Sequence, residues 1–149
     1  MQFNNILCVC TGNICRGPLA EAYLAQRTPR VEVAPAGTHA LIDEPADDKA
    51  IAVARAQGLS LEQHRARQLE ERIAREQDLI LVMEKNQLEW VRNNLPFARA
   101  TTFLLSHWRD GDNVDDPYRR GQYYFNTIYD RIQQCLDEWV ARIQPARRA

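Results

Sequence analysis

The sequence lacks the features that assign a protein to a membrane or to nucleic acid. No apolar run is long enough to span a bilayer, and the first residues lack the basic-then-apolar plan of a signal peptide. The 20 acidic and 19 basic side chains nearly balance, so the net charge of −1 argues against a general polyanion-binding surface. We therefore expect a cytoplasmic protein without membrane insertion or nucleic-acid binding.

Cysteine and histidine are scarce, and their spacing excludes two structural uses. The cysteines are Cys8, Cys10, Cys15 and Cys135. Three of them crowd into eight residues, which is not the disulfide framework of a secreted domain. The three histidines are scattered, so the second ligand cluster that a zinc site needs is missing. We expect neither a metal nor another cofactor.

Linkers, internal repeats and low-complexity segments are also missing. The chain has 149 residues, of which 45% are hydrophobic, and this suits one compact domain over residues 1–149. Short apolar runs predict strands at 6–9, 31–34, 78–83 and 101–105. Helical spacing predicts helices at 18–26, 46–57, 70–76, 86–94 and 123–143. This alternation predicts an α/β fold with a four-stranded, parallel, twisted sheet and helices on both faces.

The stretch CTGNICRGP, from Cys10 to Pro18, joins the first strand to the first helix. Its small and turn-forming residues favour a loop whose backbone N–H groups point into one hollow, beside the positive end of a helix. A phosphate monoester fits such a hollow, and Arg16 can close it with a bidentate fork. The same field is expected to lower the pKa of Cys10 and to supply a thiolate nucleophile.

This run resembles, almost residue for residue, the phosphate loop of the low-molecular-weight protein tyrosine phosphatases, C-x-G-N-x-C-R-S-P. The resemblance extends along nearly the whole chain, and within the loop only the serine is replaced, by Gly17. It implies that Cys10 and Arg16 are catalytic. It also implies that the phosphate contacts the loop residues Thr11, Gly12, Asn13, Ile14, Cys15 and Arg16.

An acid that protonates the leaving oxygen is expected in the long polar loop at 106–121. Its run Asp115-Asp116-Pro117-Tyr118 resembles the general-acid loop of the family, in which the acid directly precedes the proline. That position makes Asp116 the catalytic acid. The adjacent Asp115 is an alternative. Two neighbouring carboxylates can raise one another's pKa, which suits a group that must act as an acid.

Two further positions are expected to form the walls of the substrate pocket. Tyr118 matches a family position on one wall, and Leu41, in the loop after the second strand, matches the opposite wall. A deep slot between these side chains admits an aryl phosphate, because a flat ring stacks on Tyr118. Phosphoserine fits poorly, because its shorter stem leaves the phosphate above the loop.

Asn13 and His64 are expected to support the loop. Asparagine tolerates left-handed backbone conformations, and the run at 64–68 resembles an H-x-A-R-Q motif whose histidine contacts the loop asparagine. Pro35 stands where the family tends to have a serine in this network. Together with Gly17, it removes two hydroxyl groups from the support of one loop, which brings the turnover rate into question.

The resemblance implies a protein-tyrosine-phosphatase that works through a cysteinyl-phosphate, as a monomer or weak dimer. The overall pattern is most similar to bacterial members tied to surface-polysaccharide production, whose substrate is an autophosphorylated tyrosine kinase. It also implies a reversible disulfide between Cys10 and Cys15 that protects the nucleophile, although Cys15 can instead be a packed small residue.

Two alternatives remain open from the sequence. A thiol-dependent arsenate reductase of the same fold needs two further cysteines in a mobile segment, but residues 70–105 contain none and Cys135 falls in a predicted helix. A phosphotyrosine-binding module with little turnover is the second alternative, which the loss of two hydroxyls makes conceivable. Retention of Cys10, Arg16 and Asp116 opposes it.

Overall fold

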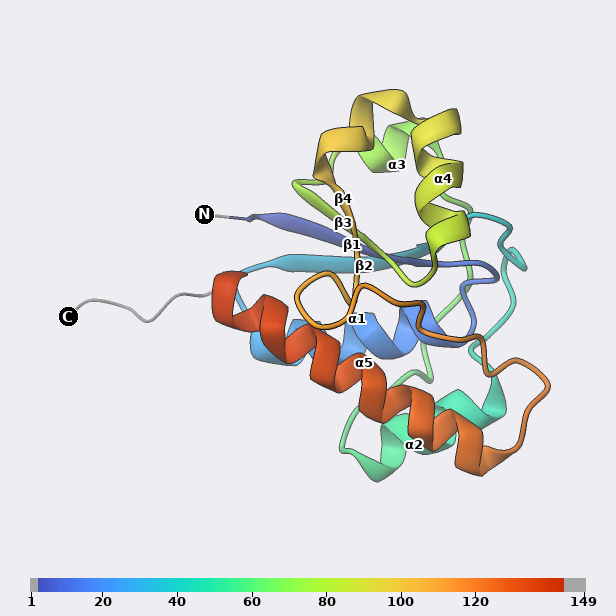
Figure 1. The fold of residues 1–149 in the computed structure, drawn as a ribbon. Coiled ribbons are helices and arrows are strands. Elements are labelled where there is room, and N and C mark those ends of the chain that lie inside the picture. Colours follow the sequence, from blue (N-terminus) through green and yellow to red (C-terminus); the bar gives the residue numbers. More distant parts are fainter. Residues whose placement is uncertain (1–2, 144–149) are drawn as a thin grey trace.

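The computed structural model describes residues 3–143 and contains the expected parallel sheet (Figure 1). The strands are β1 (Asn5–Cys10), β2 (Glu32–Gly37), β3 (Leu79–Val82) and β4 (Thr102–Leu104). Their order is β2-β1-β3-β4, and every neighbouring pair is parallel. The predicted four-stranded α/β fold is confirmed, with β1 in the interior of the sheet.

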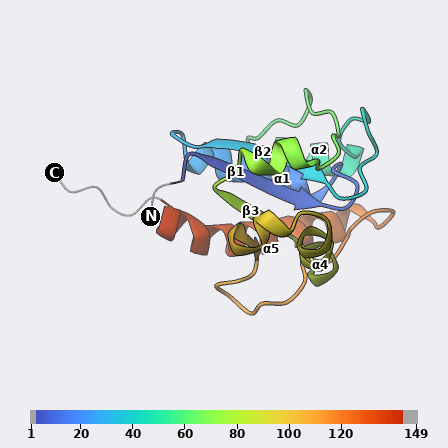
Figure 2. The same cartoon turned by 90° about the horizontal axis from the view of Figure 1, so that it is seen from above.

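Helices cover both faces of this sheet. They are α1 (Arg16–Arg27), α2 (Asp48–Ala56), α3 (Glu71–Arg75), α4 (Lys85–Asn94) and α5 (Gln122–Ile143). Figure 1 shows α1, α2 and α5 on one face and α3 and α4 on the other, and Figure 2 gives the view from above, from the side of α4. A 3₁₀ turn at Pro96–Thr101 was not expected, and it carries the chain from α4 into β4.

The interior strands are continuous apolar runs because helices cover both faces of the sheet. In β1, Ile6 and Cys8 face the core beneath α1, α2 and α5, whereas Leu7 and Val9 face the core beneath α3 and α4. Successive side chains of a strand point to opposite faces, so a strand covered on both sides needs apolar residues at every position. This is why the two interior strands were recognisable as runs rather than as alternations.

Strand β2 continues to Gly37, beyond the predicted end at residue 34. Pro35 does not end it, because β2 lies at the edge of the sheet, where a residue without an N–H is tolerated. The strand reaches the Cys10–Arg16 loop closely: a Cβ atom on Gly37 would lie 2.4 Å from the carbonyl oxygen of Thr11. Only glycine fits this approach.

All four strands end at the same edge of the sheet, where ligands bind in parallel α/β folds. The loops after β1, β2, β3 and β4 therefore converge there, and the last of them leads into α5. None of the helices between residues 3 and 143 combines the length and apolar content that a membrane crossing requires.

Candidate active site

The loop between β1 and α1 is shaped as an anion-binding hollow. Asn13 adopts a left-handed conformation with φ of 62°, which asparagine tolerates better than most residues. The N-cap residue Cys15 makes no side-chain capping bond, so the N–H of Arg16 remains for a bound anion. The backbone N–H of Gly17 donates to the sulfur of Cys10 over 3.3 Å.

The pKa of Cys10 is set by a balance between burial and local positive charge. Burial has the largest influence and raises the pKa of this thiol, while Arg16 and the N–H groups of Gly17 and Asn13 oppose that shift. The sequence led us to expect a lowered pKa, and this expectation is wrong in the structure. The loop encloses the sulfur so fully that its loss of hydration outweighs the favourable field.

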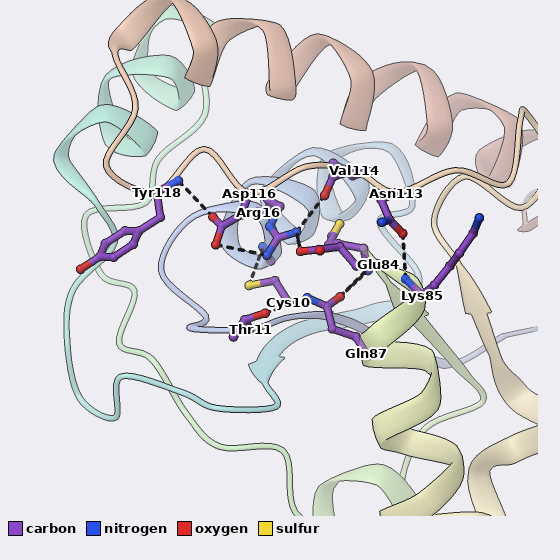
Figure 3. Close-up of polar contacts among 12 residues, drawn as sticks. Cys10, Thr11, Arg16, Glu84, Lys85, Gln87, Asn113, Val114, Asp116 and Tyr118 are labelled. Carbon is purple, nitrogen blue, oxygen red and sulfur yellow. Dashed lines mark hydrogen bonds and ion pairs between the residues drawn. The ribbon is translucent and has the colours of Figure 1, made fainter.

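Arg16 is held in place by groups far away in the sequence (Figure 3). Its side chain is 2% exposed, and its Nη1 donates to the carbonyl of Val114 over 2.8 Å and to the carboxylate of Glu84. The Nη2 atom lies 3.6 Å from a carboxylate oxygen of Asp116. Sequence reasoning missed both anchors of Nη1, which fix the plane of the guanidinium.

A capping box connects the start of α4 to the same loop. The side-chain oxygen of Gln87 accepts hydrogen bonds from the N–H groups of Met83 and Glu84, at 2.8 and 3.0 Å. Its Nε2 donates to the hydroxyl of Thr11 over 3.0 Å. Glutamate followed three residues later by glutamine, at the start of a predicted helix, was the available signal for this arrangement.

The structure distinguishes Asp116 from Asp115 by position. Asp116 lines the cavity above the loop; one of its oxygens accepts the N–H of Tyr118 over 3.0 Å while the other faces Arg16. Asp115 is exposed and is not among the residues that line this cavity. The choice of Asp116 as the acid stays a prediction, and its place in the cavity is compatible with that role.

Arg131, on α5, ties down the segment that leads to Asp116. Its guanidinium makes two hydrogen bonds to the carboxylate of Asp110, at 2.9 and 3.0 Å, and donates to the carbonyl of Asp112 over 3.0 Å. The N–H of Val114 then donates to the backbone carbonyl of Met83 over 2.8 Å. These contacts hold the loop as far as Val114, and sequence reasoning did not identify Arg131.

The cavity above the loop, of about 170 Å³, has the two expected walls. Leu41 and Tyr118 both line it, with exposed fractions of 43% and 42% that leave their surfaces available to a ligand. His39 also lines it and was missed from the sequence. The ring of His39 packs edge-on against Trp90 at a centroid distance of 6.1 Å.

His64 and Asn13 meet as the sequence led us to expect. The Nε2 atom of His64 lies 2.6 Å from the backbone carbonyl of Asn13, so this nitrogen carries the proton and donates. The side-chain amide of Asn13 donates to the carbonyl of Arg67 over 3.3 Å. Burial lowers the pKa of His64, which favours the neutral ring.

Gly17 leaves two buried polar atoms without the partner that a serine could provide. A Cβ atom at this position would lie 3.1 Å from the Cys10 sulfur and 3.3 Å from the side-chain oxygen of Asn13. That oxygen is buried and has no hydrogen-bond partner within residues 3–143. A hydroxyl on such a Cβ could therefore reach both atoms, so this departure from the motif has a definite structural consequence.

Fold and site together define a class of protein. The model of the family "low molecular weight phosphotyrosine protein phosphatase" matches residues 5–149, so the chain belongs to this family and is a protein-tyrosine-phosphatase. It is 42% identical over 143 residues to Etp of Escherichia coli K12, covering 96% of this chain and 97% of Etp. It is also 42% identical to Wzb of the same strain over 139 residues, 93% of this chain and 95% of Wzb. The protein is of the Wzb/Etp type.

Solved structures agree with this assignment. Wzb of E. coli K30 in complex with sulphate superimposes with a TM-score of 0.93 at 39% identity, covering 96% of this chain and all of that one. Wzb of Vibrio vulnificus in complex with benzylphosphonate gives a TM-score of 0.91 at 38% identity, covering 94% and 99%. The arginine phosphatase YwlE shares the fold, with a TM-score of 0.90 at 24% identity, covering 96% and 97%.

Proposed function

We propose that this phosphatase hydrolyses phosphotyrosine through a cysteinyl-phosphate intermediate, with Cys10 as nucleophile and Asp116 as acid and base. One observation carries the proposal: the thiol, the guanidinium of Arg16 and the carboxylate line a single cavity beneath an apolar slot. The phosphate sits in the hollow formed by the backbone N–H groups of residues 11–16. The thiol of Cys10 lines the same hollow, and from there it attacks phosphorus opposite the bond to be broken.

In the first step the Cys10 thiolate attacks phosphorus, the bond from phosphorus to the tyrosine oxygen breaks, and Asp116 gives its proton to that oxygen. Glu84 and Val114 occupy Nη1 of Arg16. Nε and the N–H of Nη2 that does not face Asp116 are therefore the pair left to bind two equatorial oxygens as a fork. The charge that develops on the phosphoryl group meets donors that are already oriented.

In the second step water attacks the cysteinyl-phosphate and Asp116 accepts its proton. Cys10 leaves as a thiolate, which the N–H of Gly17 stabilises by the hydrogen bond seen in the structure. Neither step needs a metal or another cofactor. The aspartate ends the cycle protonated, ready for the next phosphotyrosine.

The slot between Leu41 and Tyr118 supports a substrate with a ring next to the phosphate. Wzb of V. vulnificus was solved in complex with benzylphosphonate, in which one carbon atom separates the ring from the phosphonate. That complex supports the same preference. The protein substrate we propose is an autophosphorylated bacterial tyrosine kinase linked to surface-polysaccharide production, in the cytoplasm. This rests on the resemblance to bacterial members with that role.

The test compares wild-type protein with Cys10→Ser on p-nitrophenyl phosphate and on phosphotyrosine, phosphoserine and phosphoarginine peptides. We expect the wild type to hydrolyse the first two, and Cys10→Ser to lose hydrolysis while still binding vanadate or phosphate.

Turnover of arsenate with added thiol would favour the reductase, although Cys135 is buried in α5 and does not line the cavity. Binding of phosphotyrosine without hydrolysis by the wild type would instead show a binding module.

A further inference from the structure

Two arginines follow directly after the pocket wall formed by Tyr118. Arg119 and Arg120 are exposed, and neither has a carboxylate within 4.0 Å among residues 3–143. The guanidinium of Arg119 lies 5.4 Å from the ring centre of Tyr118, and that of Arg120 lies 4.3 Å from the ring centre of Tyr124. Both charges lie close to the pocket wall formed by Tyr118, although neither side chain lines the cavity itself.

The backbone fixes these side chains relative to the general acid. The N–H of Arg120 donates to the carbonyl of Pro117 over 2.8 Å, and the N–H of Tyr118 donates to Asp116. Arg119 has a φ of 65°, a left-handed conformation that arginine adopts rarely. The two guanidinium groups therefore belong to the same turn as the acid and the pocket wall.

The start of α5 adds positive potential at the same place. The first turn of α5 contains no acidic residue, and the helix begins directly after Gly121. The N-terminal end of a helix carries a partial positive charge, which here adds to that of the two arginines. Asp115 and Asp116 precede the arginines in the same loop, so the positive charge is confined to the part of the loop that follows Tyr118.

Two carboxylates lie close in the sequence to the other wall. Leu41, the other wall, is followed closely by Asp43 and Glu44, which are both exposed. Neither carboxylate has an ion-pair partner within 4.0 Å in the described part of the chain.

We propose that Arg119 and Arg120 bind an anionic side chain that flanks the phosphotyrosine of the protein substrate. The inference rests on the proposed function and specifies its substrate class. Guanidinium forks bind a carboxylate and a phosphate in the same way, so an aspartate or glutamate and a second phosphotyrosine share the required chemistry.

The test uses three phosphotyrosine peptides that differ only in their flanking residues. One is neutral, one carries glutamates, and one carries a non-hydrolysable phosphonate analogue of phosphotyrosine. Exposed ion pairs contribute little individually, so we expect kcat/KM to be about 3- to 30-fold higher for an anionic peptide than for the neutral one, mainly through KM. The ratio should fall toward one in 0.5 M NaCl, because salt screens exposed charges.

The double variant Arg119→Asn/Arg120→Gln should abolish the preference, since asparagine keeps the left-handed backbone while removing the charge. Arg120→Gln alone should weaken it. Arg30→Gln removes an equal charge just before β2, at the other end of the sheet, and should leave the ratio unchanged. A preference for the glutamate or the phosphonate peptide identifies the source of the anion.

Equal kcat/KM for the neutral and both anionic peptides would overturn this inference, as would a preference that survives in the double variant. Both results leave the proposed function intact, because the neutral peptide is still hydrolysed. Failure of the wild type to hydrolyse any of the three peptides would overturn the proposed function, and this inference with it.

Discussion

Replacing Gly17 by serine would place a hydroxyl beside the nucleophile. The new Cβ would lie 3.1 Å from the Cys10 sulfur, so its hydroxyl could donate a hydrogen bond to the Cys10 thiolate. In the wild type this sulfur accepts a hydrogen bond from the N–H of residue 17. A hydrogen bond to a charged group contributes about 1.5–3 kcal/mol, which equals roughly a 10- to 150-fold change in rate if it is realised in the transition state. Such a bond stabilises the charged form, so the pKa of Cys10 should fall.

Crowding reduces this gain. The Cβ would also lie 3.3 Å from the side-chain oxygen of Asn13 and 3.4 Å from the carbonyl of Cys8, so the loop must yield by a few tenths of an ångström. We therefore expect the lower end of the range: a pKa lower by about one unit and about tenfold faster breakdown of the phospho-enzyme. In the wild type that breakdown should be slow enough to produce a pre-steady-state burst.

Two measurements check this prediction, with Gly17→Ala as the matched control. The pH dependence of inactivation by iodoacetate reports the pKa of Cys10, and stopped-flow hydrolysis of p-nitrophenyl phosphate separates the burst from the steady rate. Alanine adds the same Cβ and the same crowding without the hydroxyl, so the difference between the two variants isolates the hydrogen bond. If both variants show the same Cys10 pKa and the same steady rate, the reasoning about the missing hydroxyl is refuted.

Three further predictions concern the acid, the second loop cysteine and the tether of the acid loop. Asp116→Ala should lower kcat for phosphotyrosine by about 10²–10⁴-fold whereas Asp115→Ala should change it little; the reverse order in steady-state assays would exchange their roles. Cys15→Ser should recover less activity than wild type after peroxide and then dithiothreitol, and equal recovery would remove the protective role. Asp110→Asn should lower the melting temperature at pH 7, because Arg131 holds the pKa of Asp110 down to about 2. That stabilisation is present above about pH 4 and is lost as the pH falls toward 2, so the two proteins should converge there; a difference independent of pH in thermal melts would contradict it.

The elements that could be predicted from the sequence are those encoded by neighbouring residues. The phosphate loop and the start of α1 occupy one continuous run, and the two interior strands are continuous apolar segments. The end of β2 was misplaced because Pro35 and Gly37 are local stop signals that the edge position and the close approach to Thr11 override. Neighbouring residues in the sequence therefore predict whether a segment is a helix or a strand, but they do not predict which other segments pack against it.

The remaining features of the site depend on contacts between distant parts of the chain. Val114 contributes a backbone carbonyl to Arg16 over a separation of 98 residues, and a carbonyl has no sequence signature. Glu84 follows directly after a predicted strand, and its carboxylate is identified as an anchor only by its contact with the guanidinium. The pKa of Cys10 was predicted in the wrong direction because burial cannot be weighed against charge before the fold is known.

The arrangement of these anchors along the chain determines when activity can appear during synthesis. The phosphate loop is completed by residue 16, yet Glu84 follows 68 residues after Arg16, and Val114 follows 98 residues after it. Arg131, which ties down the acid loop, comes later still, within the last helix of the described chain. A growing polypeptide therefore emerges with its nucleophile first and its acid last. A chain in which α5 has not yet packed against α1 should therefore be inactive rather than partly active. Phosphatase activity thus reports that folding is complete.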